Sequence, residues 1–483
     1  MPLYRSLTRV GRRAGCARLL AAALLALPLL VATAEPAAAQ AAADTAATTL
    51  GGDRGGGGIP FWQRALRGLL GLSALLFVTW IFSRRRDEVR WDLVGKGLGL
   101  QLAFALLVLK TDWGRAFFRV VNDMFVALIG YTNEGARFLF GGLVGGGLQA
   151  PGGGMIQVGA EFAFSVLPTI VFFSSLMTLF YHLGLMQAVV KGMAWLMQRT
   201  LRTSGAETVS AAGNIFVGQT EAPLLVKPFI ERMTTSELNT IMTCGFATVA
   251  GGVMAAYVAM LSDQFANIAG HLLAATIMSA PAAIVVSKIL WPETDEPETG
   301  GEISVEVEEE HANAIDAAAG GAADGLRLAL NVGAMLLAFL ALIAMANGIL
   351  GWAGGLAGVE GLTLERIFGW AFSPLAWLLG VPWGDAAEIG SLLGVKMVAN
   401  EFVAFQQLSE MLAGGGGLHT RSVIIATYAL TGFANFSSIA IQIGGIGGIA
   451  PSRRSELSEL GMRAMLGGTA ATWMTATFAG VLA

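Results

Sequence analysis

The amino-acid sequence predicts an all-α membrane protein with about eight transmembrane helices, two re-entrant hairpins in an inverted repeat and one interfacial helix. Three observations predict this fold class. Only 13% of the 483 residues are charged and 54% are hydrophobic, whereas soluble chains contain about 25% charged residues. Apolar runs long enough to span a membrane recur along the chain. Two polar segments, each with a central carboxylate, stand between these runs.

The first 40 residues are predicted to form a secretory signal. Residues 1–18 contain five arginines and no acid, an apolar run follows from Leu19 to Ala34, and small residues precede Gln40. A basic, an apolar and a small-residue region in this order are typical of such signals. An uncleaved transmembrane helix is the alternative. Residues 41–63 are rich in Gly and Ala and are expected to form a flexible linker.

Apolar runs of about 20 residues, the length needed to cross the bilayer, predict the transmembrane helices. They lie near residues 64–83, 93–110, 160–186, 237–261, 265–290, 326–350, 421–445 and 459–482. Basic residues indicate the orientation, because Lys and Arg are enriched in cytoplasmic loops. Those expected on the cytoplasmic side are Arg84, Arg85, Arg86, Arg90, Lys191, Arg199, Arg202, Arg453 and Arg454. We expect a multi-pass protein of a bacterial inner membrane, with both ends of the mature chain outside.

Two polar segments between the predicted spans are expected to lie outside the bilayer core. Residues 111–145 mix charged side chains with aromatic ones, among them Trp113, Arg115 and Phe138. This mixture predicts an amphipathic helix at the membrane interface. Residues 293–325 carry a run of acids and are expected to form a cytoplasmic loop, because such runs usually mark hydrated linkers.

Glu221 and Glu401 are single carboxylates set among apolar residues. A charged acid near the bilayer centre costs about 3 kcal/mol, so each needs a partner, a proton or a wet cavity. Gly218 and Pro223 flank Glu221 and are expected to turn the backbone there. Irregular backbone at membrane depth is tolerated only where protein or a cavity surrounds it. Residues 205–230 and 385–412 are therefore predicted re-entrant hairpins; acids that lie shallow and hydrated are the alternative.

A short sequence echo follows each predicted hairpin. Residues 245–248 read Gly-Phe-Ala-Thr and residues 432–435 read Gly-Phe-Ala-Asn. The order of carboxylate and then Gly-Phe-Ala-polar thus occurs twice, in halves of opposite predicted orientation. An inverted repeat with binding sites at broken helices near the membrane midplane has this pattern.

These stretches resemble the concentrative nucleoside transporter family over roughly residues 65–483. The matching stretches are Gly218–Pro228, Ser373–Trp383, Asn400–Phe405, Gly432–Ser438 and Gly444–Met474. The resemblance implies a homotrimer that takes up nucleosides of the uridine, cytidine or adenosine type, driven in most members by sodium and in some by protons. The implied units are N-terminal scaffold spans with the interfacial helix at 64–186, a first transport repeat at 187–292, a scaffold span at 326–362 and a second transport repeat at 363–483.

The resemblance also places binding residues in both hairpins and in the broken spans. Those implied for the nucleobase are Gln219, Thr220, Glu221, Val253 and Phe433. Those implied for the ribose hydroxyls are Glu401, Asn435 and Ser438. Those implied for a sodium ion are Asn214, Val217, Thr248 and Val249. Ligation by oxygen alone suits a hard cation, although Asn214 is also a common residue type at a helix terminus.

Three alternative functions differ from sodium-coupled symport. A proton-coupled transporter of the same fold would use a carboxylate in place of the sodium site. An intramembrane enzyme would use Glu221 and Glu401 as an acid and base, but no nucleophile or phosphate-binding loop accompanies them in the sequence. A passive channel would not accumulate its substrate. The scattered cysteines and histidines show no metal-ligand spacing, and the net charge of −4 gives no indication of nucleic-acid binding.

Overall fold

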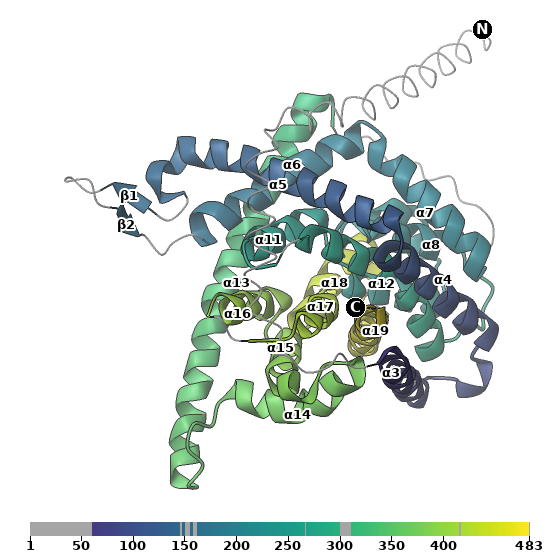
Figure 1. The fold of residues 1–483 in the computed structure, drawn as a ribbon. Coiled ribbons are helices and arrows are strands. Elements are labelled where there is room, and N and C mark those ends of the chain that lie inside the picture. Colours follow the sequence, from purple (N-terminus) through teal and green to yellow (C-terminus); the bar gives the residue numbers. More distant parts are fainter. Residues whose placement is uncertain are drawn as a thin grey trace.

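The computed structural model describes residues 60–144, 147–149, 155–157, 162–265, 267–299, 311–414 and 417–482. The predicted signal and most of the predicted linker lie outside these residues. The described chain is helical apart from a short antiparallel ribbon of β1 (Gly147–Gln149) and β2 (Met155–Gln157). The predicted all-α fold class is confirmed, with this ribbon as an addition (Figure 1).

Six helical segments in the described residues are long and apolar enough to cross a membrane. They are α3 (Phe61–Ile81), α4 (Trp91–Lys110), the π turn η3 (Phe162–Val166) continued by α6 (Leu167–His182), α10 (Thr235–Ala247) continued by α11 (Gly251–Leu261), α12 (Ile268–Leu290) and α13 (Ala314–Leu356). They correspond in order to the first six predicted spans. Helix α5 (Asp112–Phe140) fills the segment predicted to be an amphipathic helix, with Trp113 and Phe138 strongly exposed.

Of the last two predicted spans, one is divided in the structure and the other lies within one continuous helix. The run predicted at 421–445 consists of two helices, α17 (Thr420–Leu430) and α18 (Phe436–Ile449). The high average hydropathy of this run does not reveal the break between them. The run at 459–482 lies within α19 (Arg454–Leu482), a helix rich in Gly, Ala and Thr. Helix α13 begins at Ala314, inside the segment predicted to be an acidic loop.

The same order of elements occurs twice along the chain. The first series is α7 (Leu185–Leu201), α8 (Gly205–Gly213), η4 (Ala222–Val226) with α9 (Lys227–Ile230), α10, α11 and α12. The second series is α14 (Leu364–Leu379), η5 (Trp383–Asp385) with α15 (Ala386–Val398), α16 (Glu401–Ala413), α17, α18 and α19. Each series therefore has a helical hairpin, then a broken helix, then a long unbroken helix.

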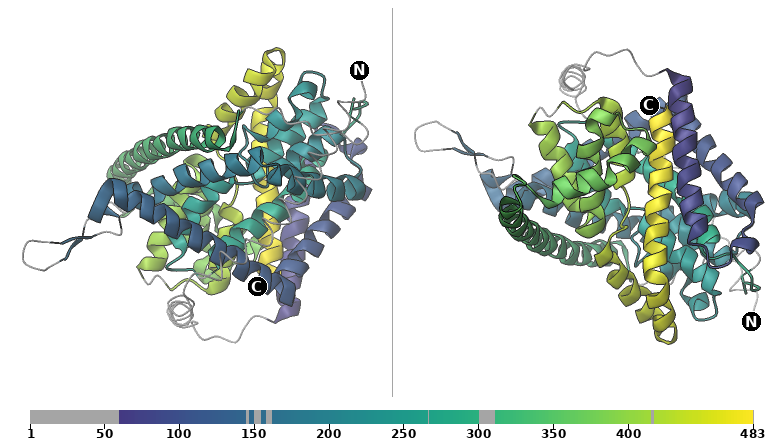
Figure 2. Two further views of the ribbon diagram at one scale, coloured as in Figure 1. Left: turned by 90° about the horizontal axis from the view of Figure 1, so that it is seen from above. Right: turned by 90° about the horizontal axis from the view of Figure 1, so that it is seen from below.

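The core lies where the two series meet. Helices α12 and α19 pack against each other and against the broken helices α10 and α17. In the most apolar stretch of α12, 89% of the residues are buried, whereas in the most apolar stretch of α13 only 17% are buried. Figure 1 shows α13 as a long helix along one edge, and Figure 2 shows α19 beside α3. Helix α12 is thus a central element and α13 a peripheral one.

Candidate functional site

The first hairpin turns sharply after α8. Helix α8 starts with a capping box, in which Ser204 and Glu207 each bond the backbone amide of the other. It ends at Gly213, and irregular backbone follows until η4. A Cβ atom at Gly218 would lie 2.1 Å from Oε2 of Glu221, so the carboxylate folds back over this glycine. The irregular backbone includes residues 218–221, and the turn was predicted between Gly218 and Pro223.

The second hairpin breaks at residues 399 and 400. Ala399 leaves helical geometry with φ −90° and ψ −93°, and Asn400 caps the next helix by accepting a hydrogen bond of 2.9 Å from the amide of Val403. Helix α16 then begins with Glu401. A helix N-terminus carries a partial positive charge that stabilises a nearby anion. The break thus places the Glu401 carboxylate in a favourable field.

The two broken helices touch each other at their breaks. The backbone between α17 and α18 passes through Gly432 with φ +98°, a left-handed conformation that favours glycine. A Cβ atom there would lie 2.7 Å from the carbonyl oxygen of Phe246 in α10. The close approach of these two backbone segments explains the glycine in the second Gly-Phe-Ala echo.

Glu401 is almost fully buried and accepts two hydrogen bonds. Tyr257 Oη in α11 donates to Oε1 at 3.0 Å, and Asn435 Nδ2 donates to Oε2 at 2.9 Å. Asn435 also caps α18, because its Oδ1 accepts a bond of 2.9 Å from the amide of Ser438. The carboxylate is therefore held by groups from both broken helices.

Gln219 at the tip of the first hairpin joins the same network. Its Nε2 donates to Ser438 Oγ at 3.3 Å, and its Oε1 accepts from Gln442 Nε2 at 3.0 Å. Gly245 lies beneath this pair, since a Cβ atom there would lie 2.8 Å from Gln442 Nε2 and 3.0 Å from Gln219 Cβ. Four predicted site residues thus lie in one hydrogen-bonded network: Gln219, Glu401, Asn435 and Ser438.

The remaining residues predicted for the nucleobase lie less centrally. Thr220 Oγ1 donates to Glu221 Oε1 at 3.0 Å, and Glu221 is exposed. Val253 is buried and Phe433 partly buried, and both belong to the main apolar cluster. The structure brings Thr220 and Glu221 together, but among the described residues neither forms a hydrogen bond to the buried network around Glu401.

The residues predicted for sodium lie where the first hairpin meets the first broken helix. The amide of Gly251 donates to the carbonyl oxygen of Phe216 at 3.0 Å and joins the two segments. Asn214 is fully buried; its Nδ2 donates to the carbonyl oxygen of Ser210 at 3.1 Å, and its Oδ1 has no hydrogen-bond partner among the described residues. A buried carbonyl oxygen of this kind fits a cation ligand, because a buried polar atom without a partner is costly.

Three polar residues of this region are missing from the sequence prediction. Tyr257 and Gln442 donate to predicted site residues, and Lys396 in α15 donates from Nζ to the carbonyl oxygens of Ala429 and Thr431, each at 2.9 Å. All three lie inside apolar runs, and a buried polar residue in such a run needs a partner. A polar side chain inside an apolar run was therefore the sequence signal that could have identified these three residues.

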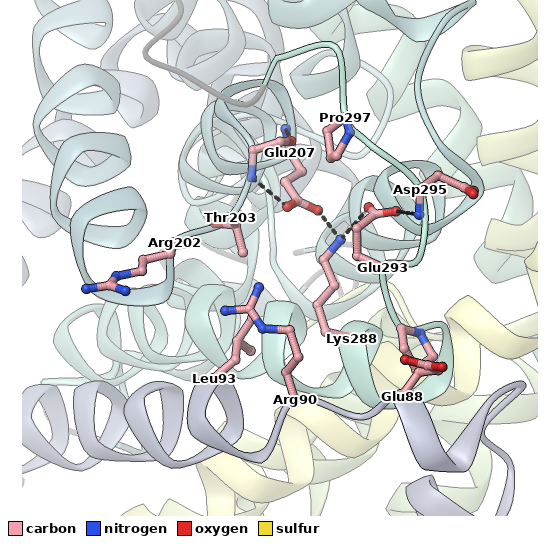
Figure 3. Close-up of a pocket in the computed structure, with 12 residues that line it drawn as sticks. Glu88, Arg90, Leu93, Arg202, Thr203, Glu207, Lys288, Glu293, Asp295 and Pro297 are labelled. Carbon is pink, nitrogen blue, oxygen red and sulfur yellow. Dashed lines mark hydrogen bonds and ion pairs between the residues drawn. The ribbon is translucent and has the colours of Figure 1, made fainter.

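A pocket of about 340 Å³ lies away from this network, at the end of α12 (Figure 3). Its centre is the buried Lys288, whose Nζ lies 2.7 Å from Glu207 Oε2 and 3.3 Å from Glu293 Oε2. Arg90 and Arg202 also line it, so basic residues predicted on one membrane side converge here. Glu293, predicted to belong to a hydrated loop, is instead an ion-pair partner. We interpret this pocket as the junction of α8, α12 and the segment at residues 292–297 that follows α12.

Comparisons with known proteins agree over most of the chain. Family models match at residues 70–143 (Na+ dependent nucleoside transporter N-terminus), 163–264 (Nucleoside recognition) and 271–480 (Na+ dependent nucleoside transporter C-terminus). The chain is 46% identical to the uncharacterized transporter YutK of Bacillus subtilis, over 87% of this chain and 100% of that protein. It is 40% identical to mouse sodium/nucleoside cotransporter 1, over 85% of this chain and 63% of that protein.

Solved structures show the same likeness. The structure of CNTnw in an inward-facing substrate-bound state matches with a TM-score of 0.79 and 41% identity, over 87% of this chain and 98% of that one. An outward-facing variant of CNTnw matches with a TM-score of 0.80 and 42% identity, over 87% and 98% of the two chains.

Proposed function

The chain belongs to the sodium-dependent, concentrative nucleoside transporter family, and from this membership we propose that it imports nucleosides by symport with sodium across a bacterial inner membrane. The family consists of transporters and not of enzymes. The single observation that supports this function best is the buried network around Glu401, which joins both hairpins and both broken helices. Discontinuous helices near the membrane midplane are where secondary transporters bind substrate and ion.

Glu401, Asn435 and Ser438 are proposed to bind the ribose. A carboxylate offers about four acceptor positions, and Tyr257 and Asn435 occupy two of those on Glu401. The other positions can accept hydrogen bonds from two vicinal hydroxyls. A site built in this way discriminates against analogues that lack a hydroxyl, because its buried polar groups are then left unpaired.

Gln219, Thr220 and Glu221 are proposed to bind the nucleobase, with Val253 and Phe433 as its apolar contacts. Gln219 is tied to Ser438 and Gln442, so its amide has a fixed direction beside the ribose residues. The exposed pair of Thr220 and Glu221 is accessible to a substrate that enters over the hairpin tip.

Asn214, Val217, Thr248 and Val249 are proposed to hold the sodium ion. The unpartnered Oδ1 of Asn214 supports this assignment, as does the bond between Gly251 and Phe216 that joins the hairpin turn to the broken helix. An ion bound between these segments would fix the turn that carries Gln219. Ion binding would then prepare the nucleobase site, which is the coupling that symport requires.

The membrane potential adds to the sodium gradient. One inward charge gains about 2.3 kcal/mol per 100 mV, which alone corresponds to roughly fifty-fold accumulation of a neutral nucleoside. The hairpins and broken helices are proposed to enter the membrane and move against a scaffold that includes α13. The exposed apolar face of α13, with Leu330 and Leu337 at 63% and 76% exposure, supports a contact between copies in a homotrimer. Mass measurement of the detergent-solubilised protein tests this assembly.

Uptake of radiolabelled uridine into proteoliposomes tests the function. We expect accumulation above equilibrium with an inward sodium gradient and none with potassium on both sides. The variant Asn214→Ala should lose sodium activation, whereas Asn133→Ala on the more exposed helix α5 should behave as wild type. Accumulation driven by a proton gradient alone would replace sodium by protons, and equilibration without accumulation would indicate a channel.

A further inference from the structure

Lys396 is a fully buried ammonium group on the first limb of the second hairpin. Its Nζ donates to the carbonyl oxygens of Ala429 and Thr431, both at 2.9 Å, where α17 ends. These carbonyls belong to the last turn of a helix, where peptide oxygens lack an intrahelical partner and carry a partial negative charge. The ammonium thus closes the C-terminal end of the first half of a broken span.

The first repeat has the same arrangement of backbone. Helix α8 packs against α10 as α15 packs against α17. Helix α10 ends before Thr248 and α17 before Thr431, and both threonines have left helical geometry. Each hydroxyl donates to the carbonyl four residues earlier: Thr248 to Cys244 at 2.8 Å and Thr431 to Thr427 at 2.7 Å. The two helix ends are therefore equivalent in geometry as well as in order.

The two repeats differ in the polar side chain near the end of the first limb of the hairpin. The first has Asn214 directly after α8, and its buried Oδ1 is an acceptor without a partner among the described residues. The second has Lys396, whose Nζ is a donor and already bonds two carbonyl oxygens. A buried acceptor without a partner can ligate a cation from outside the chain, whereas a lysine supplies a positive charge of its own.

We propose that Lys396 is a tethered counterpart of the coupling ion. Its ammonium fills, in the second repeat, the position that sodium fills in the first. This inference rests on the proposed sodium site. One mobile ion and one covalent ammonium then close the two broken spans, and a single sodium ion accompanies each nucleoside.

The variant Lys396→Ala tests the proposal, because it removes the tethered charge and leaves room beside the carbonyls. The purified full chain is titrated with NaCl at constant ionic strength, with choline as the replacement and uridine present. A ligand that binds only the folded state raises Tm in proportion to the number of ions bound. We expect the slope of Tm against log sodium concentration to be about twice that of wild type, and the Hill coefficient for sodium in sodium-dependent uridine binding to rise from about 1 to about 2.

The matched control is Lys191→Ala, which removes an exposed lysine from α7 and should leave both quantities unchanged. The second measurement is the reversal potential of uridine-coupled current in proteoliposomes. It should report one charge per uridine in wild type and two in Lys396→Ala. Should that variant not be stable in detergent, Lys396→Gln keeps a hydrogen-bond donor without the charge and should show the same added sodium.

Three results would overturn the proposal. A folded Lys396 variant with the sodium slope and Hill coefficient of wild type would show that the lysine has no ionic role. A wild-type reversal potential that reports two sodium ions per uridine would contradict the single mobile ion. A wild type that does not respond to sodium at all would remove the sodium coupling itself, and that outcome is distinguished from the first two by the wild-type titration alone.

Discussion

At the scale of single residues, the charge of Glu401 is expected to determine nucleoside affinity. The substitution Glu401→Gln keeps the shape and weakens bonds to a charged acceptor, which contribute about 1.5–3 kcal/mol each. The loss corresponds to roughly 10–150-fold weaker uridine binding, measured by calorimetry. Glu410→Gln lies on the exposed face of the same helix and should bind uridine as wild type does. Equal affinity of Glu401→Gln and wild type would contradict the ribose assignment.

Uridine analogues that lack a ribose hydroxyl test the same site from the side of the ligand. Removing the 2′- or 3′-hydroxyl of uridine should weaken binding, by about 1–3 kcal/mol for each polar group left unpaired in a buried site. In the Glu401→Gln variant the penalty for a missing hydroxyl should shrink, since that partner is already weakened. A double-mutant cycle of protein and ligand changes measures this coupling. If the effects of Glu401→Gln and of removing the hydroxyl were additive, that hydroxyl would not contact Glu401.

Gly245 is predicted to be essential because of its place beneath Gln219 and Gln442. A Cβ atom there would require both side chains to move, and overpacking of this kind costs about 1–3 kcal/mol. We therefore expect Gly245→Ala to lose about that much stability and, because Gln219 is displaced, to bind uridine more weakly than wild type. At Gly348 in α13 a Cβ atom meets no other group within 4 Å, so Gly348→Ala is the control in the same binding assay.

At the scale of elements, the ion pairs around Lys288 are expected to hold the base of the first hairpin. The lysine is buried between Glu207 of α8 and Glu293, and it also donates to Ser236 of α10 at 2.9 Å. Removing one partner of a buried pair costs about 3–5 kcal/mol, because the other charge remains. Lys288→Met should therefore lower Tm, measured by thermal unfolding in detergent.

Lys96→Met is the matched control for this prediction. Lys96 forms an exposed pair with Asp92 at 3.4 Å, and exposed pairs contribute about 0–1 kcal/mol. Its Tm should stay close to that of wild type. If Lys288→Met were equally stable, the cluster would not be what fastens α8 to α10 and α12.

The elements show what the sequence could predict. The hairpins were predictable because Gly218, Pro223 and single carboxylates interrupt apolar runs, and these are local signals. The apolar run at 421–445 does not itself mark the break at Gly432, which the second Gly-Phe-Ala echo indicated; the steric reason for this glycine, the carbonyl of Phe246, lies in another helix. Tyr257, Lys396 and Gln442 were missed for the same reason: a hydropathy pattern marks a residue as polar or apolar but does not identify its partner across the fold.

At the scale of the whole molecule, the dimensions of α13 set it apart. Its 43 residues span about 65 Å at about 1.5 Å per residue, roughly twice the hydrocarbon thickness of a bilayer. The helix must therefore tilt strongly or extend into water at one end. Its start at Ala314, among residues predicted to be a hydrated loop, agrees with extension on that side.

The contact between Gly432 and the end of α10 has a consequence for biosynthesis. Roughly 185 residues separate the two points, so a ribosome that adds about 5–20 residues per second needs roughly 10–40 s to supply the second after the first. For most of that interval Gln219 and Tyr257 are already made, while Glu401, Asn435 and Ser438 do not yet exist. The nascent first half therefore has to be sheltered, by the insertion machinery or by lipid, until its polar groups meet the partners that only the finished chain provides.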